Sequence, residues 1–349
     1  MRDRRASEIR TLLHSGELRD IGGRPELVSP GASPPSPVRL VAAFAAVYLI
    51  WGSTYLAIRY AVESIPPLLM MAMRHVLAGG ILYAVTRLRG VPAPSLRDWK
   101  FPAIVGTILF LGGHGSLAWA EQRVPSGIAA LLVATLPMWI LLLARVSRTE
   151  EKFSARAIAG VVLGFLGVLI LFGPDAWHHN GELNLVGALA VLFGNFLWAA
   201  GTIYMRKVTM PASSVMSAAM QMIAGGASLA IAGTLSGEAS RLHSASVSLQ
   251  SWLSLLYLVV FGSIIAFTAY TWLHTVEKPS RVATYAYVNP VVAVLIGWAF
   301  AHEPVGVFTV VAMVIILIGV ALVNSGTKQG HRSETVRGEK NEQAEVAAD

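Results

Sequence analysis

Long apolar segments with almost no charged residues dominate this chain and restrict the folds that it can adopt. A helix needs about 20 predominantly apolar residues to cross a bilayer. Only 13% of the 349 residues are charged, whereas a soluble globular protein has about 25%. The sequence therefore predicts an all-α polytopic membrane protein with ten transmembrane helices joined by short loops. We place these helices near 41–62, 67–86, 102–120, 125–145, 157–173, 185–205, 215–234, 252–273, 280–301 and 305–324.

The basic residues predict the orientation of these segments. With the N-terminus inside, the cytoplasmic loops hold twelve Lys and Arg, whereas the external loops hold only Arg123 and Arg241. Basic residues concentrate in the cytoplasmic loops of membrane proteins. We therefore expect both termini in the cytoplasm. The net charge of +7 belongs to these loops, so it does not indicate nucleic-acid binding.

Polar tails flank the apolar region. Residues 1–38 end in a stretch rich in Pro and Ser, and residues 326–349 are polar, so we expect both tails to be disordered and cytoplasmic. The first tail has no apolar stretch typical of a cleavable signal peptide, which predicts that the first span is an uncleaved anchor. The chain has no cysteine, which excludes disulfides and thiolate metal sites.

An internal repeat divides the apolar region into two halves. The stretch 51–59, Trp51-Gly52-Ser53-Thr54-Tyr55-Leu56-Ala57-Ile58-Arg59, is echoed 147 positions later by 198–206, and a Trp precedes an Arg by eight residues in both copies. Spans with Pro137 and Pro290 also correspond. Five spans in each half is an odd number, so the second half must be inserted upside down. Inverted repeats are typical of secondary transporters, which bind their substrates near mid-membrane where the repeats meet.

On these motifs, the chain resembles an EamA-type carrier of the drug/metabolite transporter superfamily, nearest to the YedA-type inner-membrane exporters. The resemblance covers about residues 40–325 and rests on Trp51-Gly52-Ser53-Thr54-Tyr55, on Arg74 and on the two proline-containing spans. It implies two EamA repeats, 39–173 and 184–325, an inner-membrane location, and a cavity lined mainly by spans 1, 3, 4, 6, 8 and 9. It also implies efflux of amino acids or related metabolites, with drugs as a further class.

Aromatic and polar residues on the spans expected to line the cavity are the candidates for substrate binding. Aromatic walls with few charges suit an amphipathic solute better than a phosphorylated one. For about half of the aromatic residues, a place in the membrane interface or against lipid is the alternative. The predicted substrate-binding residues are Trp51, Tyr55, His114, Trp198, Tyr204, Tyr270, Tyr285 and Asn289.

Titratable residues within the membrane bear on ion coupling. All acids of residues 39–325 sit in loops or at span ends, so coupling through a buried carboxylate has no support from the sequence. His114 lies mid-span among glycines, where it either faces the cavity or bonds to a neighbouring helix. If transport is coupled to protons, His114 is the first candidate, with His75 and Glu121 behind it. Facilitated export is the alternative.

Two arginines and two prolines are predicted to serve gating or structure. A charge within the hydrocarbon is costly, so each Arg should face protein or water. We expect Arg59 to snorkel or to support an external gate. Arg74 either binds a substrate carboxylate or bonds to the first span, and the structural role is favoured. Pro137 and Pro290 predict kinks that are either hinges or static bends.

The expected binding partners are a small-molecule substrate and the lipid bilayer. We expect no cofactor, metal or nucleic acid. There is no phosphate-binding G-x-x-x-x-G-K-[ST] stretch. Gly160, Gly164 and Gly167 favour packing of the fifth span within one chain, and leave a monomer or a homodimer open. The leading hypothesis is a secondary transporter, not an enzyme, that exports small amphipathic metabolites by alternating access. The alternative is a multi-pass membrane enzyme that acts on a lipid-linked substrate.

Overall fold

The computed structural model describes residues 36–147, 154–172, 184–211, 213–277 and 279–325. This described part consists of helices joined by short loops and contains no strand, which confirms the all-α polytopic membrane fold. The tail 326–349 and most of 1–38 lie outside it. Two apolar helices, Ala155–Leu171 and Tyr285–Ala301, are shorter than the others, and a count of ten spans needs both of them. Eight helices are long and apolar enough to cross a membrane: Pro37–Val62, Pro67–Leu88, Leu96–Glu121, Ser126–Val146, Leu185–Met205, Ser214–Leu235, Leu249–His274 and Val307–Ser325.

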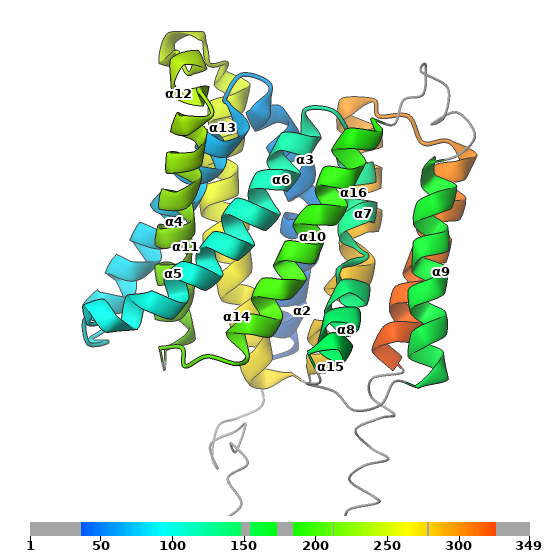
Figure 1. The fold of residues 1–349 in the computed structure, drawn as a ribbon, viewed down its shortest axis with the longest axis horizontal. Helices are drawn as coiled ribbons and strands as arrows, with labels where there is room; N and C mark the ends of the chain where they lie inside the picture. Colours follow the sequence, from blue (N-terminus) through cyan, green and yellow to red (C-terminus); the bar gives the residue numbers. More distant parts are fainter. Residues whose placement is uncertain (1–35, 148–153, 173–183, 212, 278, 326–349) are drawn as a thin grey trace, which may run out of the picture.

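Several of these long helices are composed of shorter pieces (Figure 1). In the first half the elements are α2 (Pro37–Ala45), η1 (Ala46–Ile50), α3 (Trp51–Val62), α4 (Pro67–Leu88), η2 (Leu96–Trp99), α5 (Lys100–Gly106), η3 (Thr107–Gly115), α6 (Ser116–Glu121), α7 (Ser126–Val133), α8 (Leu136–Val146) and α9 (Ala155–Phe172). In the second half they are α10 (Leu185–Met205), α11 (Ser214–Leu235), α12 (Glu238–Arg241), η5 (Ser244–Ser246), α13 (Leu249–Tyr257), η6 (Leu258–Ile265), α14 (Ala266–Val276), α15 (Pro279–Val282), α16 (Tyr285–Ala301) and the final helix Val307–Ser325.

The third span of each half contains a π-helical segment, η3 in the first half and η6 in the second. A third segment of this kind, η1, directly precedes Trp51. The π-helix is rare in proteins and occurs mostly at functional sites. The positions of η3 and η6 therefore indicate a functional site where these segments contact the other half.

The two predicted proline kinks differ. Pro137 lies in the first turn of α8, and the helix is interrupted between Val133 and Leu136. Proline lacks an N–H group and suits a first helical turn, so it marks the restart of the helix. Pro290 lies inside α16, which runs on without interruption.

Small residues bring helices of this bundle close together. The second spans of the two halves, α4 and α11, pack along each other. At one edge (Figure 1), α9 packs on the final helix, where a Cβ added to Gly160 would lie 2.6 Å from the carbonyl oxygen of Gly319. Gly167 faces Ile316 of the same helix. The prediction that this glycine face packs within one chain is confirmed.

Candidate functional site

An aromatic cluster joins the first span to two spans of the second half. The ring centroid of Trp51 lies 5.0 Å from that of Tyr270 on α14 and 5.3 Å from that of Tyr285 on α16, and the two tyrosine centroids are 5.7 Å apart. The indole Nε1 donates a hydrogen bond of 3.0 Å to the carbonyl oxygen of Gly262 in η6. The structure thus brings together three residues that the sequence proposed separately.

A second cluster forms around His114 in η3. Its ring lies between those of His75 on α4 and Trp198 on α10, with centroid distances of 5.0 and 4.7 Å. His114 Nδ1 and His75 Nε2 share a hydrogen bond of 2.9 Å, whose donor depends on the tautomer. Phe110 closes the cluster, 4.2 Å from the His75 ring. His114 therefore does bond to a neighbouring helix, and His75 belongs to the same group.

The two clusters correspond to each other across the repeat. Trp51 of the first half contacts η6 of the second half, and Trp198 of the second half packs on η3 of the first. A Cβ at Gly113 would lie 2.7 Å from the Trp198 ring, so the indole occupies the space that glycine leaves. Each half therefore places its tryptophan on the π-helical segment of the other.

A polar residue three positions before each tryptophan binds the proline-containing span of the other half. The hydroxyl of Tyr48 lies 2.5 Å from that of Thr284, at the start of α16. Asn195 donates from Nδ2 to the carbonyl oxygen of Leu132, 2.8 Å away, shortly before the interruption that precedes Pro137. Both spans that contain a predicted kink are thus held by a side chain from the opposite repeat.

Not every predicted binding residue joins these clusters. Tyr55 lies one turn beyond Trp51 and interacts electrostatically with both Tyr285 and Glu121, so it connects the first cluster with the acidic group described below. Asn289 is buried, and its Oδ1 has no hydrogen-bond partner in the described part of the chain. Tyr204, at the far end of α10, makes no ring contact with other described residues.

Arg74 is buried at the inner face of α4. Its Nε donates a hydrogen bond of 2.9 Å to Ser263 Oγ in η6. The structural bond that the sequence suggested toward the first span is therefore made to the eighth span instead. This contact fixes Arg74 between the second span of one half and the third span of the other.

Arg59 forms an ion pair with Glu303, which follows α16. The same carboxylate accepts hydrogen bonds from Ser126 N and Ser126 Oγ, both at 2.8 Å, and from Gly127 N at 2.9 Å. These two residues begin α7, where the first N–H groups of a helix lack internal partners and favour an anion. His302, with φ of 51°, turns the chain so that Glu303 points back into the protein. One carboxylate thus ties α3, α7 and the end of α16 together.

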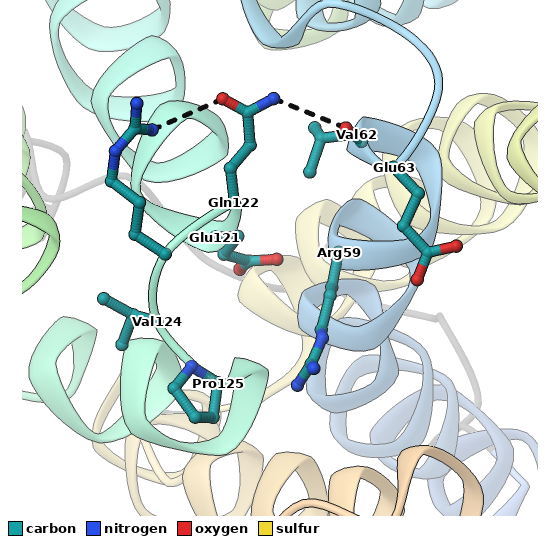
Figure 2. Close-up of a pocket in the computed structure, with 8 residues that line it drawn as sticks. Arg59, Val62, Glu63, Glu121, Gln122, Val124 and Pro125 are labelled. Atoms are coloured by element: carbon teal, nitrogen blue, oxygen red, sulfur yellow. Dashed lines mark hydrogen bonds between the residues drawn. The ribbon is translucent and has the colours of Figure 1, made fainter. Parts of the chain in front are cut away.

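Glu121 borders an open cavity of about 520 Å³ (Figure 2). Glu121 is only 3% exposed, and neither of its carboxylate oxygens has a hydrogen-bond partner in the described part of the chain. Glu121 and Glu303 do lie at span ends, as the sequence predicted, but both are buried, which nothing in the sequence indicated. The cavity is lined by Arg59, Val62, Glu63, Glu121, Gln122, Arg123, Val124 and Pro125.

The sequence placed Glu303 in a loop. Its role in joining helices depends on its tertiary contact with Arg59 and the start of α7. One sequence signal could have found it, because Glu303 and Glu150 correspond in the repeat and each follows a proline-containing span. Glu150 lies outside the described residues. Within the described chain, no group of three or more His, Asp or Glu side chains is arranged to hold a metal ion.

Comparisons with known proteins agree with this architecture. The model of the EamA-like transporter family matches residues 39–173 and 185–325. The chain is 39% identical over 290 residues to YedA of Escherichia coli K12, described as an uncharacterized inner membrane transporter, and the match covers 82% of this chain and 91% of that protein. It is 25% identical over 281 residues to the uncharacterized transporter YvbV of Bacillus subtilis 168, over 80% of this chain and 90% of the other.

A crystal structure of a protein 21% identical to this chain aligns with a TM-score of 0.56, over 82% of this chain and 98% of that one. This likeness shows a shared fold. The two family matches span both halves of the apolar region, and together they cover most of the chain. The chain belongs to the EamA-like transporter family and is a multi-pass membrane transporter.

Proposed function

We propose that this transporter is a secondary carrier that exports small amphipathic metabolites across the inner membrane by alternating access. The substrates are amino acids or related compounds, with drugs as a further class. Inner-membrane location is supported by the description of YedA. Both termini lie in the cytoplasm in this proposal, because the basic residues concentrate in the loops on that side.

This proposal depends on one observation, the reciprocal packing of Trp51 and Trp198 across the two halves. Each tryptophan rests on a π-helical segment of the opposite repeat. Rocking of one repeat against the other is the usual mode of alternating access in carriers built from inverted repeats. Such a movement changes both tryptophan contacts together, so these residues lie where a transported solute and the moving interface meet.

The chemistry of the interface supports the substrate class. Trp51, Tyr270 and Tyr285 supply apolar ring surface with a few hydroxyl groups. Arg74 adds one buried positive charge near this surface. An interface that is largely aromatic, with a few placed polar groups, suits a ligand with an apolar body and a polar end.

Counterflow in proteoliposomes tests this function. Vesicles with purified protein are loaded with an unlabelled amino acid or a cationic dye and diluted into the same compound in labelled form. We expect transient accumulation of at least one label without any ion gradient. Failure of every member of the panel to exchange, both without and with an imposed proton gradient, by protein shown to be folded, would contradict the proposal.

A further inference from the structure

Glu121 is an acid buried without a partner. Both of its oxygens are inaccessible to solvent and accept no hydrogen bond from the described residues, although the residue borders the cavity in Figure 2. An ionised carboxylate buried in this way loses its hydration, and the backbone of Arg59 and the positive charges of Arg59 and Arg74 offset that loss only in part. A protonated carboxyl group avoids most of that cost. The burial of Glu121 in this conformation therefore favours its protonated form.

The charged groups around Glu121 come from three directions. Tyr55 and Arg59 face it from α3, Arg74 faces it from α4, and Glu303 faces it from beyond α16. Of the other elements packed against α6, α7 has no titratable side chain, α10 has only Tyr204 at its far end, and η3 has only His114. Arg59, Arg74, Glu121 and Glu303 thus share one region, and Glu63 and Arg123 line the adjoining cavity together with Arg59 and Glu121.

Both arginines are engaged elsewhere. Arg59 pairs with Glu303, and this carboxylate is held in addition by Ser126 and Gly127 at the start of α7. Arg74 is bonded to Ser263. Glu121 is consequently the acid of the group that has no counter-ion in contact. Arg59 borders the same cavity as Glu121, so a change of its side-chain conformation can exchange one acid for the other.

We propose that Glu121 is a proton-binding site and that Arg59 controls its occupancy by exchanging Glu303 for Glu121 as its partner. While Arg59 and Glu303 are paired, α3, α7 and the end of α16 are tied together and Glu121 carries a proton. When α3 separates from Glu303, Arg59 turns to Glu121. The O–H bond of the carboxyl group then breaks, the proton passes to water in the cavity, and Arg59 neutralises the carboxylate charge that remains.

This inference concerns the proton site and needs no substrate, so it stands or falls separately from the proposed metabolite export. Its consequence for transport does rest on the proposed function. Because opening of the ion pair and loss of the proton are one event, a cycle that opens this side of the carrier moves a proton. The substitution Glu121→Gln then leaves exchange without a gradient intact and abolishes accumulation driven by a proton gradient.

Infrared difference spectroscopy of the full-length protein in lipid vesicles tests the site directly. A protonated carboxyl group has its own C=O stretch, which disappears when the group ionises. We expect a band that persists to near-neutral pH in the native protein and is missing in Glu121→Gln. Glu63→Gln is the matched control, because Glu63 borders the same cavity but is exposed, and this substitution should leave the band unchanged. Burial also raises the pKa of Glu238, so any band from Glu238 is common to both proteins. A native protein without the band, or a Glu121→Gln spectrum that equals the native one, overturns the proposal.

Two further variants test the partner exchange. Glu303→Gln releases Arg59, so the Glu121 band should disappear at a lower pH than in the native protein. Arg59→Gln removes the cation that changes partner in this proposal, so the band should persist to a higher pH. Each shift should be about one pH unit or more. Shifts in the same direction, or none, overturn the role of Arg59.

Glu303 also holds the start of α7, so Glu303→Gln is tested for a native melting temperature first. If that variant does not fold, Ser126→Ala replaces it, because this change removes one hydrogen bond to Glu303 and leaves every charge in place. In Ser126→Ala, the Glu121 band should disappear at a lower pH than in the native protein, by a smaller shift than the one expected for Glu303→Gln. An unchanged band in folded Ser126→Ala, together with an unchanged band in Arg59→Gln, contradicts the exchange.

Discussion

Gly79 on α4 lies directly against Met222 on α11, and a Cβ added to Gly79 would come within 2.8 Å of the Met222 Cβ. The next residue, Gly80, has open space around the same position, with no neighbouring atom within 4 Å. Both glycines belong to the stretch Ala78-Gly79-Gly80, which recurs in the second half as residues 224–226. In the first copy, close helix packing therefore requires one glycine and not the other.

This difference predicts opposite effects of two adjacent substitutions. Gly79→Ala should lower the free energy of unfolding by about 1 to 3 kcal/mol, because the two helices must separate or shift. Gly80→Ala should be neutral or stabilise the protein by up to about 1 kcal/mol, because alanine is the better helix former. Unfolding of detergent-solubilised protein, followed by tryptophan fluorescence, measures both. Equal losses in the two variants would show that helix packing at Gly79 does not need glycine.

Trp51→Ala should impair transport without preventing folding. The substitution removes the ring contacts with Tyr270 and Tyr285 and the bond to the Gly262 carbonyl oxygen. We expect the initial rate of counterflow to fall about tenfold or more, which corresponds to roughly 1.4 kcal/mol. Trp298→Ala is the control, because Trp298 lies on α16 but is 60% exposed, and its variant should exchange at the native rate. Native rates in Trp51→Ala at equal abundance would remove Trp51 from the site.

The long apolar runs were sufficient to predict an all-helical multi-pass membrane protein, because a continuous apolar stretch of this length has few alternatives to a membrane helix. The burial of Glu121 and Glu303 was not predictable from their positions. It depends on which helix ends meet in space, and a sequence without its tertiary contacts does not specify that. The π-helical segments η3 and η6 were not predictable either, because they contact Trp198 and Trp51 of the opposite half, which are distant in the sequence.

Leu96 and Leu235 test the predicted orientation. Both are highly exposed, at 92% and 83%, and they lie at the start of η2 and the end of α11, which the basic residues assign to opposite sides of the membrane. The native chain has no cysteine, so single substitutions to Cys give an unambiguous label. A membrane-impermeant maleimide applied to the outside of spheroplasts should label Leu235→Cys and leave Leu96→Cys unlabelled until the cells are lysed. The reverse pattern would invert the orientation.

The His75–His114 pair predicts a coupling between two substitutions. His114→Phe leaves the buried His75 ring without its partner, which should cost about 1 to 3 kcal/mol of stability. The double variant, with Phe at both positions, should lose less than the sum of the single variants, because no unpaired polar group remains. Unfolding midpoints of the four proteins form a double-mutant cycle that measures this coupling. Additive losses of stability would mean that the 2.9 Å hydrogen bond between His75 and His114 contributes nothing to the free energy of unfolding.

Glu238 provides a prediction for pH outside the membrane spans. It begins α12 beside the start of α4 (Figure 1), and its Oε2 accepts a hydrogen bond of 3.0 Å from Leu69 N. Burial raises the pKa of Glu238 above its ordinary value, and the bonds from the α4 backbone oppose this effect only in part. A raised pKa in the folded state means that the protein holds this proton more tightly than the unfolded chain does. The contribution to stability is therefore complete at acidic pH and is lost as the pH rises through the folded pKa.

Glu238→Gln should isolate this effect, because glutamine keeps an acceptor for Leu69 N but does not titrate. We expect the melting temperature of the variant to rise relative to that of the native protein as the pH increases from about 4 to about 8. Glu63→Gln serves as the control at an exposed position, and its difference from the native protein should stay constant over this range. If Glu238→Gln instead loses stability relative to the native protein with rising pH, the backbone bonds outweigh burial and the folded pKa lies below the ordinary value.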